Sequence, residues 1–280
     1  MKKINAILIT LLFVMLQYHL VAQGIPTLNA NICGKGNQTI IFIPGFACSG
    51  DVWKETVAGY EKSNRCIVLT MPGIAGVPPL QTATISYWEK IIADYIIDHK
   101  IDHPIIVGHS MGGVLALTLA ADHPDLVSKI VVVDALPCLS ALSNPTFKTK
   151  ENNDCGSTIA MMTGMNDDQF YNMQVGMLPR LVADTTRVKT IAHWGITSDR
   201  KTLGEIYCDF QNTDVREKIT EIHCPTLVLL EPSFANIKPA IEEQYKNLKG
   251  AQLMYAAKGL HFIMYDDMEW YNKQLAAFIK

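Results

Sequence analysis

Apolar residues in this chain form short continuous runs, and between them lie longer stretches in which apolar positions recur every three or four residues. A continuous apolar run is typical of a strand that is buried on both faces of a parallel sheet. Residues 85–97 show the other pattern, because Ile85, Trp88, Ile92 and Ile96 fall on one side of a helix. The alternation predicts an α/β fold, with a mostly parallel central sheet and flanking helices. The predicted buried strands are residues 39–43, 66–70, 104–107, 129–134, 224–230 and 251–256.

Two further patterns predict the two ends of this domain. Residues 29–33, before a glycine-rich turn, are expected to form an edge strand. Near the other end, Asp266 and Glu269 have the spacing of a capping box that would open a C-terminal helix.

The alternation stops after residue 134 and resumes near residue 221. Asparagine, proline and glycine residues divide this stretch into short helical candidates, and a structureless loop of such length is improbable in a compact domain. We therefore predict a helical cap at residues 138–220, inserted into a core formed by residues 23–137 and 221–280. Methionines adapt to irregular shapes and suit an apolar pocket, although for any single one packing inside the cap's own core is the better explanation. The cap methionines are Met161, Met162, Met165, Met173 and Met177.

One stretch carries the strongest candidate chemistry. The strand at 104–107 leads into Gly108-His109-Ser110-Met111-Gly112, and a helical segment follows at once. Glycines on both sides of Ser110 remove side chains that would collide in a sharp turn, and Ser110 itself must adopt a strained conformation. The turn pushes the hydroxyl of Ser110 out of the sheet, and it aims the amide of Met111 at the space beside that hydroxyl. The dipole of the following helix favours negative charge there.

In its strand–turn–helix context this segment resembles the nucleophile elbow, Gly-x-Ser-x-Gly, of the α/β-hydrolase superfamily. The resemblance implies a nucleophilic Ser110 and the chain order serine, acid, histidine. His261 is the only late histidine that lies in a loop after the last predicted strand, so it is the expected base. In this family the loop after the strand at 39–43 donates a second N–H group to an oxyanion hole. Pro44-Gly45 replaces the usual His-Gly pair there, which assigns the amide of Phe46 to this role beside that of Met111.

Serine, acid and histidine form the catalytic triad of this family, and the resemblance is weakest for the acid. The commonest family pattern has an aspartate in the loop after the strand at 224–230, but Phe234 stands at that position. Asp134, at the end of the strand after the elbow, matches the arrangement of pancreatic-type lipases and is our first candidate. Glu231 is the alternative acid. Two further possibilities are that a cap acid such as Asp209 supports His261 and that no acid does.

Composition narrows the class of partner. The chain has 280 residues with 49% hydrophobic and 18% charged residues and a net charge of −3, which argues against disorder and against binding to nucleic acid. The expected partner is a neutral small-molecule ester. The spacing of the cysteines shows no metal pattern such as C-x-x-C, and we predict no metal and no organic cofactor.

The first residues have the layout of a secretory signal peptide. Lys2 and Lys3 precede an apolar run at residues 4–16, and Ala22 offers a small residue for cleavage. The rival interpretation is an uncleaved anchor, but the run is shorter than the roughly 20 residues that a bilayer span needs. We predict a signal peptide at residues 1–22, a secreted or periplasmic protein, and no stable membrane span after cleavage. Export would allow some of the seven cysteines to oxidise, in a pairing that the sequence does not reveal.

Together these patterns predict an exported serine hydrolase that cleaves a small to medium, largely apolar carboxylic ester or thioester through an acyl-enzyme. Two alternatives remain. Other chemistry of the same fold, such as carbon–carbon bond hydrolysis or a lyase reaction, would use the same residues. A catalytically weak ligand-binding protein on this fold is favoured by the missing aspartate at the usual position.

Overall fold

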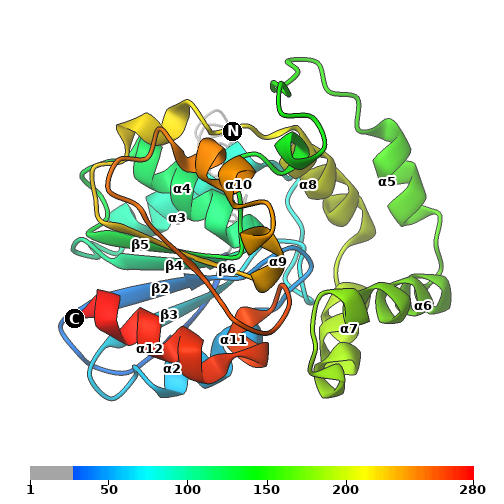
Figure 1. Cartoon of the computed structure of the whole chain (residues 1–280). Helices are drawn as coiled ribbons and strands as arrows, with labels where there is room; N and C mark the ends of the chain where they lie inside the picture. Colours follow the sequence, from blue (N-terminus) through cyan, green and yellow to red (C-terminus); the bar gives the residue numbers. More distant parts are fainter. Residues whose placement is uncertain (1–27) are drawn as a thin grey trace, which may run out of the picture.

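A single sheet forms the centre of the computed structural model, which describes residues 28–280 (Figure 1). Its strand order is β1-β3-β2-β4-β5-β6-β7; β1 is antiparallel to β3, and every other neighbouring pair is parallel. The predicted α/β architecture is confirmed, and so is the edge position of residues 29–33. The strands are β1 (Asn29–Cys33), β2 (Thr39–Ile43), β3 (Arg65–Thr70), β4 (Ile105–His109), β5 (Lys129–Val133), β6 (Thr226–Leu230) and β7 (Gln252–Tyr255).

Helices cover both faces of the sheet, which is why every residue of β2, β4 and β6 is buried. In β2, Ile41 and Ile43 belong to the core under α3 (Ile85–Asp98) and α4 (Met111–Asp122). Ile40 and Phe42 point the other way, toward α2 (Lys54–Ala58) and α12 (Met268–Ile279). Figure 1 shows α3 and α4 above the sheet and α2 and α12 below it. Successive strand residues alternate between the two cores because their side chains alternate between the faces of a sheet.

The segment for which a cap is predicted is helical. Figure 1 shows α5 to α8 gathered beside one end of the sheet. Two of the connections between core elements are also short helices, η1 (Gly50–Trp53) and α11 (Ile263–Asp266). Between β5 and β6 the chain forms η2 (Leu139–Leu142), α5 (Gly156–Thr163), α6 (Asp167–Met177), η3 (Leu178–Arg180), η4 (Thr185–Arg187), α7 (Val188–Ile196), α8 (Arg200–Asn212) and η5 (Lys218–Glu221), and after β6 it forms α9 (Pro232–Ala235) and α10 (Lys238–Tyr245).

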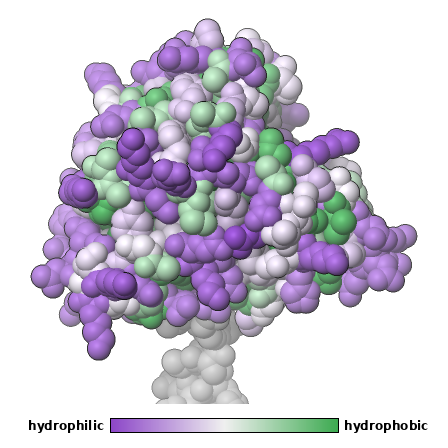
Figure 2. Space-filling view, turned by 60° about the horizontal axis from the view of Figure 1, so that its bottom comes forward, coloured by the Kyte–Doolittle hydropathy of each residue, from purple (hydrophilic) through white to green (hydrophobic). Residues whose placement is uncertain are grey.

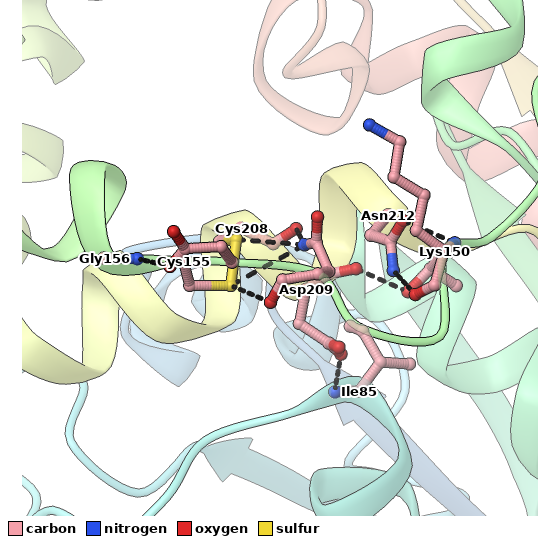
Figure 3. The surroundings of a disulfide bond; sticks show 10 residues. Ile85, Lys150, Cys155, Gly156, Cys208, Asp209 and Asn212 are labelled. Carbon is pink, nitrogen blue, oxygen red and sulfur yellow. Dashed lines mark hydrogen bonds between the residues drawn. A yellow bond between two sulfur atoms is a disulfide. The ribbon is translucent and has the colours of Figure 1, made fainter.

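Two acids of α8 join the cap to the start of α3. Asp209 Oδ2 accepts a hydrogen bond of 2.7 Å from the amide of Ile85, as Figure 3 shows. One turn earlier in α8, Glu205 Oε2 accepts one of 3.0 Å from the amide of Ala83. Carboxylates at a helix N-terminus are favourable because the first amides lack partners within the helix and the helix dipole is positive there. These bonds give α8 a defined position on the core.

A disulfide holds α5 against α8. Cys155, just before α5, is bonded to Cys208 of α8 across a sequence separation of 53 residues (Figure 3). Asn153 Nδ2 donates a hydrogen bond of 3.4 Å to the carbonyl oxygen of Cys208 and so holds the approach to α5 in place. The remaining five cysteines form no disulfide within the described residues.

The predicted capping box at the C-terminal helix is wrong. Helix α12 begins at Met268 with Asp267 as its N-cap, and that cap makes no side-chain hydrogen bond. Asp266 belongs to α11 instead, and its carboxylate accepts the amide of Leu260 and the amides of two cap residues. The aspartate therefore serves tertiary contacts rather than the helix that follows it.

The face formed by α2, α11 and α12 is mostly hydrophilic. Figure 2 turns this side toward the reader and shows apolar residues only in small, separate groups. Buried apolar residues of these helices, such as Val57, Ile263 and Leu275, pack toward the sheet instead. Within residues 28–280, no helix combines the length and the apolar character needed to cross a bilayer. The predicted signal peptide at residues 1–22 lies outside the described residues.

The disulfide should contribute to the stability of the fold. Replacing both cysteines (Cys155→Ser with Cys208→Ser) should lower the free energy of unfolding by about 2–4 kcal/mol, because a long loop in the unfolded chain is no longer closed. Urea denaturation followed by circular dichroism measures this change. A reducing agent should weaken the wild type to the same degree and leave the double variant unchanged. Equal unfolding midpoints for oxidised wild type and double variant would contradict the prediction.

Candidate active site

Loops from five strands meet at one cavity on the carboxyl edge of the sheet. Phe46 follows β2, Ser110 follows β4, Asp134 follows β5, Glu231 follows β6 and His261 follows β7, and all five line a cavity of about 590 Å³. Parallel strands place their carboxyl ends at the same edge, which is where ligands bind in open α/β sheets. The topology thus brings together residues that lie far apart in sequence.

Ser110 stands at a strained turn between β4 and α4. Its backbone has φ 54° and ψ −123°, a conformation that residues other than glycine rarely adopt. The flanking glycines are sterically required: a Cβ on Gly108 would lie 2.1 Å from the carbonyl oxygen of Gly112, and one on Gly112 would lie 2.4 Å from that of Ile43. The predicted reason for both glycines is confirmed.

The loop after β2 runs directly beside this turn. A Cβ on Gly45 would lie 3.1 Å from the Cβ of Ser110, so the backbone that leads into Phe46 approaches the serine closely. Within the described part of the chain, neither the amide of Phe46 nor that of Met111 donates to a protein acceptor. Two unused N–H groups therefore flank the serine, one from each loop, as an oxyanion hole requires.

Asp134 and His261 form a hydrogen-bonded pair. His261 Nδ1 lies 2.6 Å from Asp134 Oδ2, and the carboxylate side chain is only 1% exposed. The other oxygen, Oδ1, accepts a bond of 2.7 Å from the amide of Glu231. Burial raises the pKa of Asp134, and the bonds from His261 and from the amide of Glu231 partly offset this rise because they favour the carboxylate form. The pair leaves Nε2 of His261 as the nitrogen for proton transfer.

The other two acids weighed from the sequence have different partners. Glu231 Oε1 accepts the hydroxyl of Ser233, and the side chain lines the cavity without a hydrogen bond to His261. Asp209 contacts the amide of Ile85 at the outer end of the cap. Of the acids considered, the structure joins only Asp134 to His261 within residues 28–280.

Ser110 and His261 line the same cavity, but among the described residues no hydrogen bond joins Ser110 Oγ to His261 Nε2. In unliganded enzymes such bonds are often long and tighten when substrate binds. The arrangement therefore provides a hydroxyl, an imidazole with a buried carboxylate behind it, and two free amides around one cavity.

His109 contributes a contact that the sequence did not suggest. The sequence gives this residue only as a member of the elbow motif, and the structure buries it, with 1% exposure, beside the loop of His261. Its Nε2 donates a hydrogen bond of 3.0 Å to the carbonyl oxygen of His261, and the two rings are 4.6 Å apart. Burial and the nearby His261 lower the pKa of His109 well below its ordinary value, so the ring stays neutral. Only the tertiary fold, which brings the last loop onto the elbow, reveals this contact.

The cap supplies much of the apolar wall of the cavity. Four of the predicted cap methionines line it, whereas Met165 packs against the core under α3 and α4. The side chain of Gln174 on α6 is polar and lies within this wall, where it is 5% exposed. The cap residues at the cavity include Met161, Met162, Met173, Gln174, Met177, Leu178, Leu181, Tyr207 and Phe210.

The part of the chain that the structure describes contains no group of three or more histidine, cysteine, aspartate or glutamate side chains placed to hold a metal ion.

Several known proteins with similar sequences or structures are named as hydrolases or esterases. Residues 38–158 match the family described as having the alpha/beta hydrolase fold. The chain is 24% identical over 250 residues to a putative carbamate hydrolase, RutD, from Yersinia enterocolitica, a match that covers 86% of the chain and 87% of that protein. A pimeloyl-acyl-carrier-protein methyl ester esterase from Vibrio vulnificus is 32% identical over 108 residues, or 39% of the chain and 40% of the esterase. The crystal structure of an enol-lactonase from Burkholderia xenovorans superposes with a TM-score of 0.73 at 16% identity, covering 90% of the chain and 96% of the lactonase.

Proposed function

We propose that this chain, which has the alpha/beta hydrolase fold, is a serine hydrolase that cleaves a small to medium, largely apolar carboxylic ester or thioester through an acyl-enzyme. The observation that carries this proposal is the bond between His261 Nδ1 and Asp134 Oδ2, at the cavity to which the strained turn presents Ser110. A buried carboxylate behind an imidazole is the arrangement that prepares a neighbouring hydroxyl for attack.

In the proposed mechanism Ser110 Oγ attacks the carbonyl carbon of the substrate while His261 Nε2 takes the hydroxyl proton. The amides of Phe46 and Met111 hold the negative charge that develops on the carbonyl oxygen, each contributing on the order of 3 kcal/mol to the barrier. Asp134 orients the ring and stabilises the imidazolium. His261 then protonates the leaving alcohol or thiol, and water activated by the same histidine releases the acyl group.

The cavity supports an apolar acyl group of limited size. Its volume of about 590 Å³ lies within the range of small-molecule sites, and side chains of Met162, Met173 and Leu178 form part of its wall. No cluster of cationic side chains that would select a phosphate or a peptide carboxylate lines it; Arg180 is the one arginine at its edge among the described residues. Similarity to a putative carbamate hydrolase, a methyl ester esterase and an enol-lactonase supports attack on an ester-like carbonyl.

An activated serine is the first expectation to test. A fluorophosphonate probe should label the wild type and fail to label Ser110→Ala. With p-nitrophenyl acetate, butyrate and octanoate, kcat/KM should rise from acetate to butyrate and fall once the chain exceeds the cavity. Ser110→Ala should abolish hydrolysis of all three. Absence of labelling would favour the ligand-binding alternative, and labelling without ester hydrolysis would favour carbon–carbon bond cleavage or a lyase reaction.

The choice of acid gives a second expectation. Asp134→Asn should lower kcat by about 10³–10⁴-fold, because an amide neither holds the ring nitrogen in the required tautomer nor stabilises the imidazolium. Glu231→Gln is the matched control, since its side chain bonds Ser233, and its kcat should stay close to that of the wild type. Steady-state kinetics on p-nitrophenyl butyrate compare the two. The reverse order of effects would assign the acid to Glu231.

We propose in addition that the protein is exported and that residues 1–22 are removed. The basic start, the apolar run and Ala22 support this proposal. The Cys155–Cys208 disulfide supports it independently, because disulfides persist in oxidising compartments and are rare in the reducing cytosol.

Export predicts a defined mature protein. When the full-length chain is expressed in a bacterial host, periplasmic or medium fractions should contain protein that begins at Gln23, as measured by N-terminal sequencing. Replacing the apolar run by a polar segment is the control and should retain the chain in the cytosol. Recovery of uncleaved wild type from the cytosol alone would count against export.

A further inference from the structure

The loop that carries His261 is attached to both the core and the cap. On the core side, His109 Nε2 donates to the carbonyl oxygen of His261 at 3.0 Å. On the cap side, the amide of the next residue, Phe262, donates to the carbonyl oxygen of Leu181 at 3.1 Å. The position of the loop that carries His261 therefore depends on contacts with both the core and the cap.

Asp266 strengthens the attachment on the cap side. Its Oδ2 accepts the amide of Leu260 at 2.9 Å, one residue before His261. The same carboxylate accepts the amide of Ala183 at 2.9 and 3.0 Å and that of Asp184 at 3.0 Å. Within the described residues it takes part in no ion pair, so backbone amides are its partners. Bonds to a charged acceptor are stronger than bonds between neutral groups.

The local backbone is built to admit this carboxylate. Gly259 has φ +94°, and a Cβ at this position would lie 2.8 Å from the Cβ of Asp266. The loop can fold closely over Asp266 only because residue 259 lacks a side chain. The close approach of the loop to Asp266 thus requires both the carboxylate of Asp266 and the glycine at position 259.

The cap segment held by Asp266 continues directly from the cavity wall. Leu178, Arg180 and Leu181 line the cavity, and Ala183 and Asp184, which bond to Asp266, follow within the same turn of chain. A substrate acyl group that packs against Leu178 and Leu181 presses on the segment that Asp266 ties to the loop of His261. No other acid of the described residues bridges these two segments by hydrogen bonds.

We propose that Asp266 is a positioning residue: it couples the cap wall of the cavity to the orientation of His261, so that filling the acyl site aligns the base. This inference rests on the proposed function, because it assigns a consequence for catalysis to the cap contact. Asp266 acts through the loop and does not touch the reacting atoms.

The test compares Asp266→Asn with Glu269→Gln, an exposed acid in the first turn of α12. Asparagine keeps the shape but loses the charge and one acceptor oxygen. With p-nitrophenyl butyrate, Asp266→Asn should lower kcat by about 10-fold with little change in KM, since a misplaced base slows the chemical step more than binding. The kinetics are expressed per site titrated with the fluorophosphonate, so that loss of folded enzyme does not lower the value. Glu269→Gln should match the wild type, and an unchanged kcat per titrated site in Asp266→Asn would overturn the inference.

A second readout does not depend on catalysis. In the wild type the Nδ1 proton of His261, held by Asp134, should give a downfield proton NMR signal that is absent in His261→Gln. Asp266→Asn should broaden this signal through faster exchange with water, and Glu269→Gln should leave it unchanged. If the wild type neither hydrolyses esters nor reacts with the probe, the proposed function fails, and this signal still decides the positioning role. A signal that is identical in Asp266→Asn and wild type would refute that role.

Discussion

The bond between Asp134 and His261 is the constraint around which the site is arranged. A carboxylate whose side chain is 1% exposed is costly to bury unless hydrogen bonds compensate for the lost water, and here the ring of His261 and the amide of Glu231 provide them. These partners lie on the loops after β7 and β6, while Asp134 itself ends β5. One buried charge thus fixes three neighbouring loops relative to one another, and it orients the imidazole toward the cavity that holds Ser110.

The elbow and the acid differ in how far sequence alone can predict them. Gly108 and Gly112 are required by close contacts within a few residues of each other, so the local pattern was sufficient to place Ser110 at the strained turn. The acid is selected by tertiary distance. Asp134 and Glu231 both follow parallel strands at the same edge, and the sequence ranks Asp134 first only by a resemblance to pancreatic-type lipases. Their different partners, His261 for one and Ser233 for the other, appear only when the loops are assembled.

Side-chain direction explains the features that sequence reasoning missed or misread. His109, the last residue of β4, points away from Ser110 and meets a loop that lies 152 residues later. Asp266 has the spacing of a helix cap, but amides of the cap and of the loop before it compete successfully for its oxygens. The Cys155–Cys208 bond likewise depends on the packing of α5 on α8, which spacing along the chain does not encode.

The contacts that attach the cap to the core differ in their consequences for the proposed function. Asp209 joins α8 to the start of α3 and so attaches the cap to the core, whereas the disulfide joins α5 to α8 within the cap. Asp266 lies where the cap reaches the loop of His261, and its bonds pass from the cavity wall to the residue before the base. Because hydrophobic packing of the methionine-lined wall adapts to shape whereas hydrogen bonds have defined geometry, an acyl group can vary within the cavity while the alignment of His261 is set by a few directional bonds. This division allows a tolerant acyl site to coexist with the narrow geometric requirements of proton transfer.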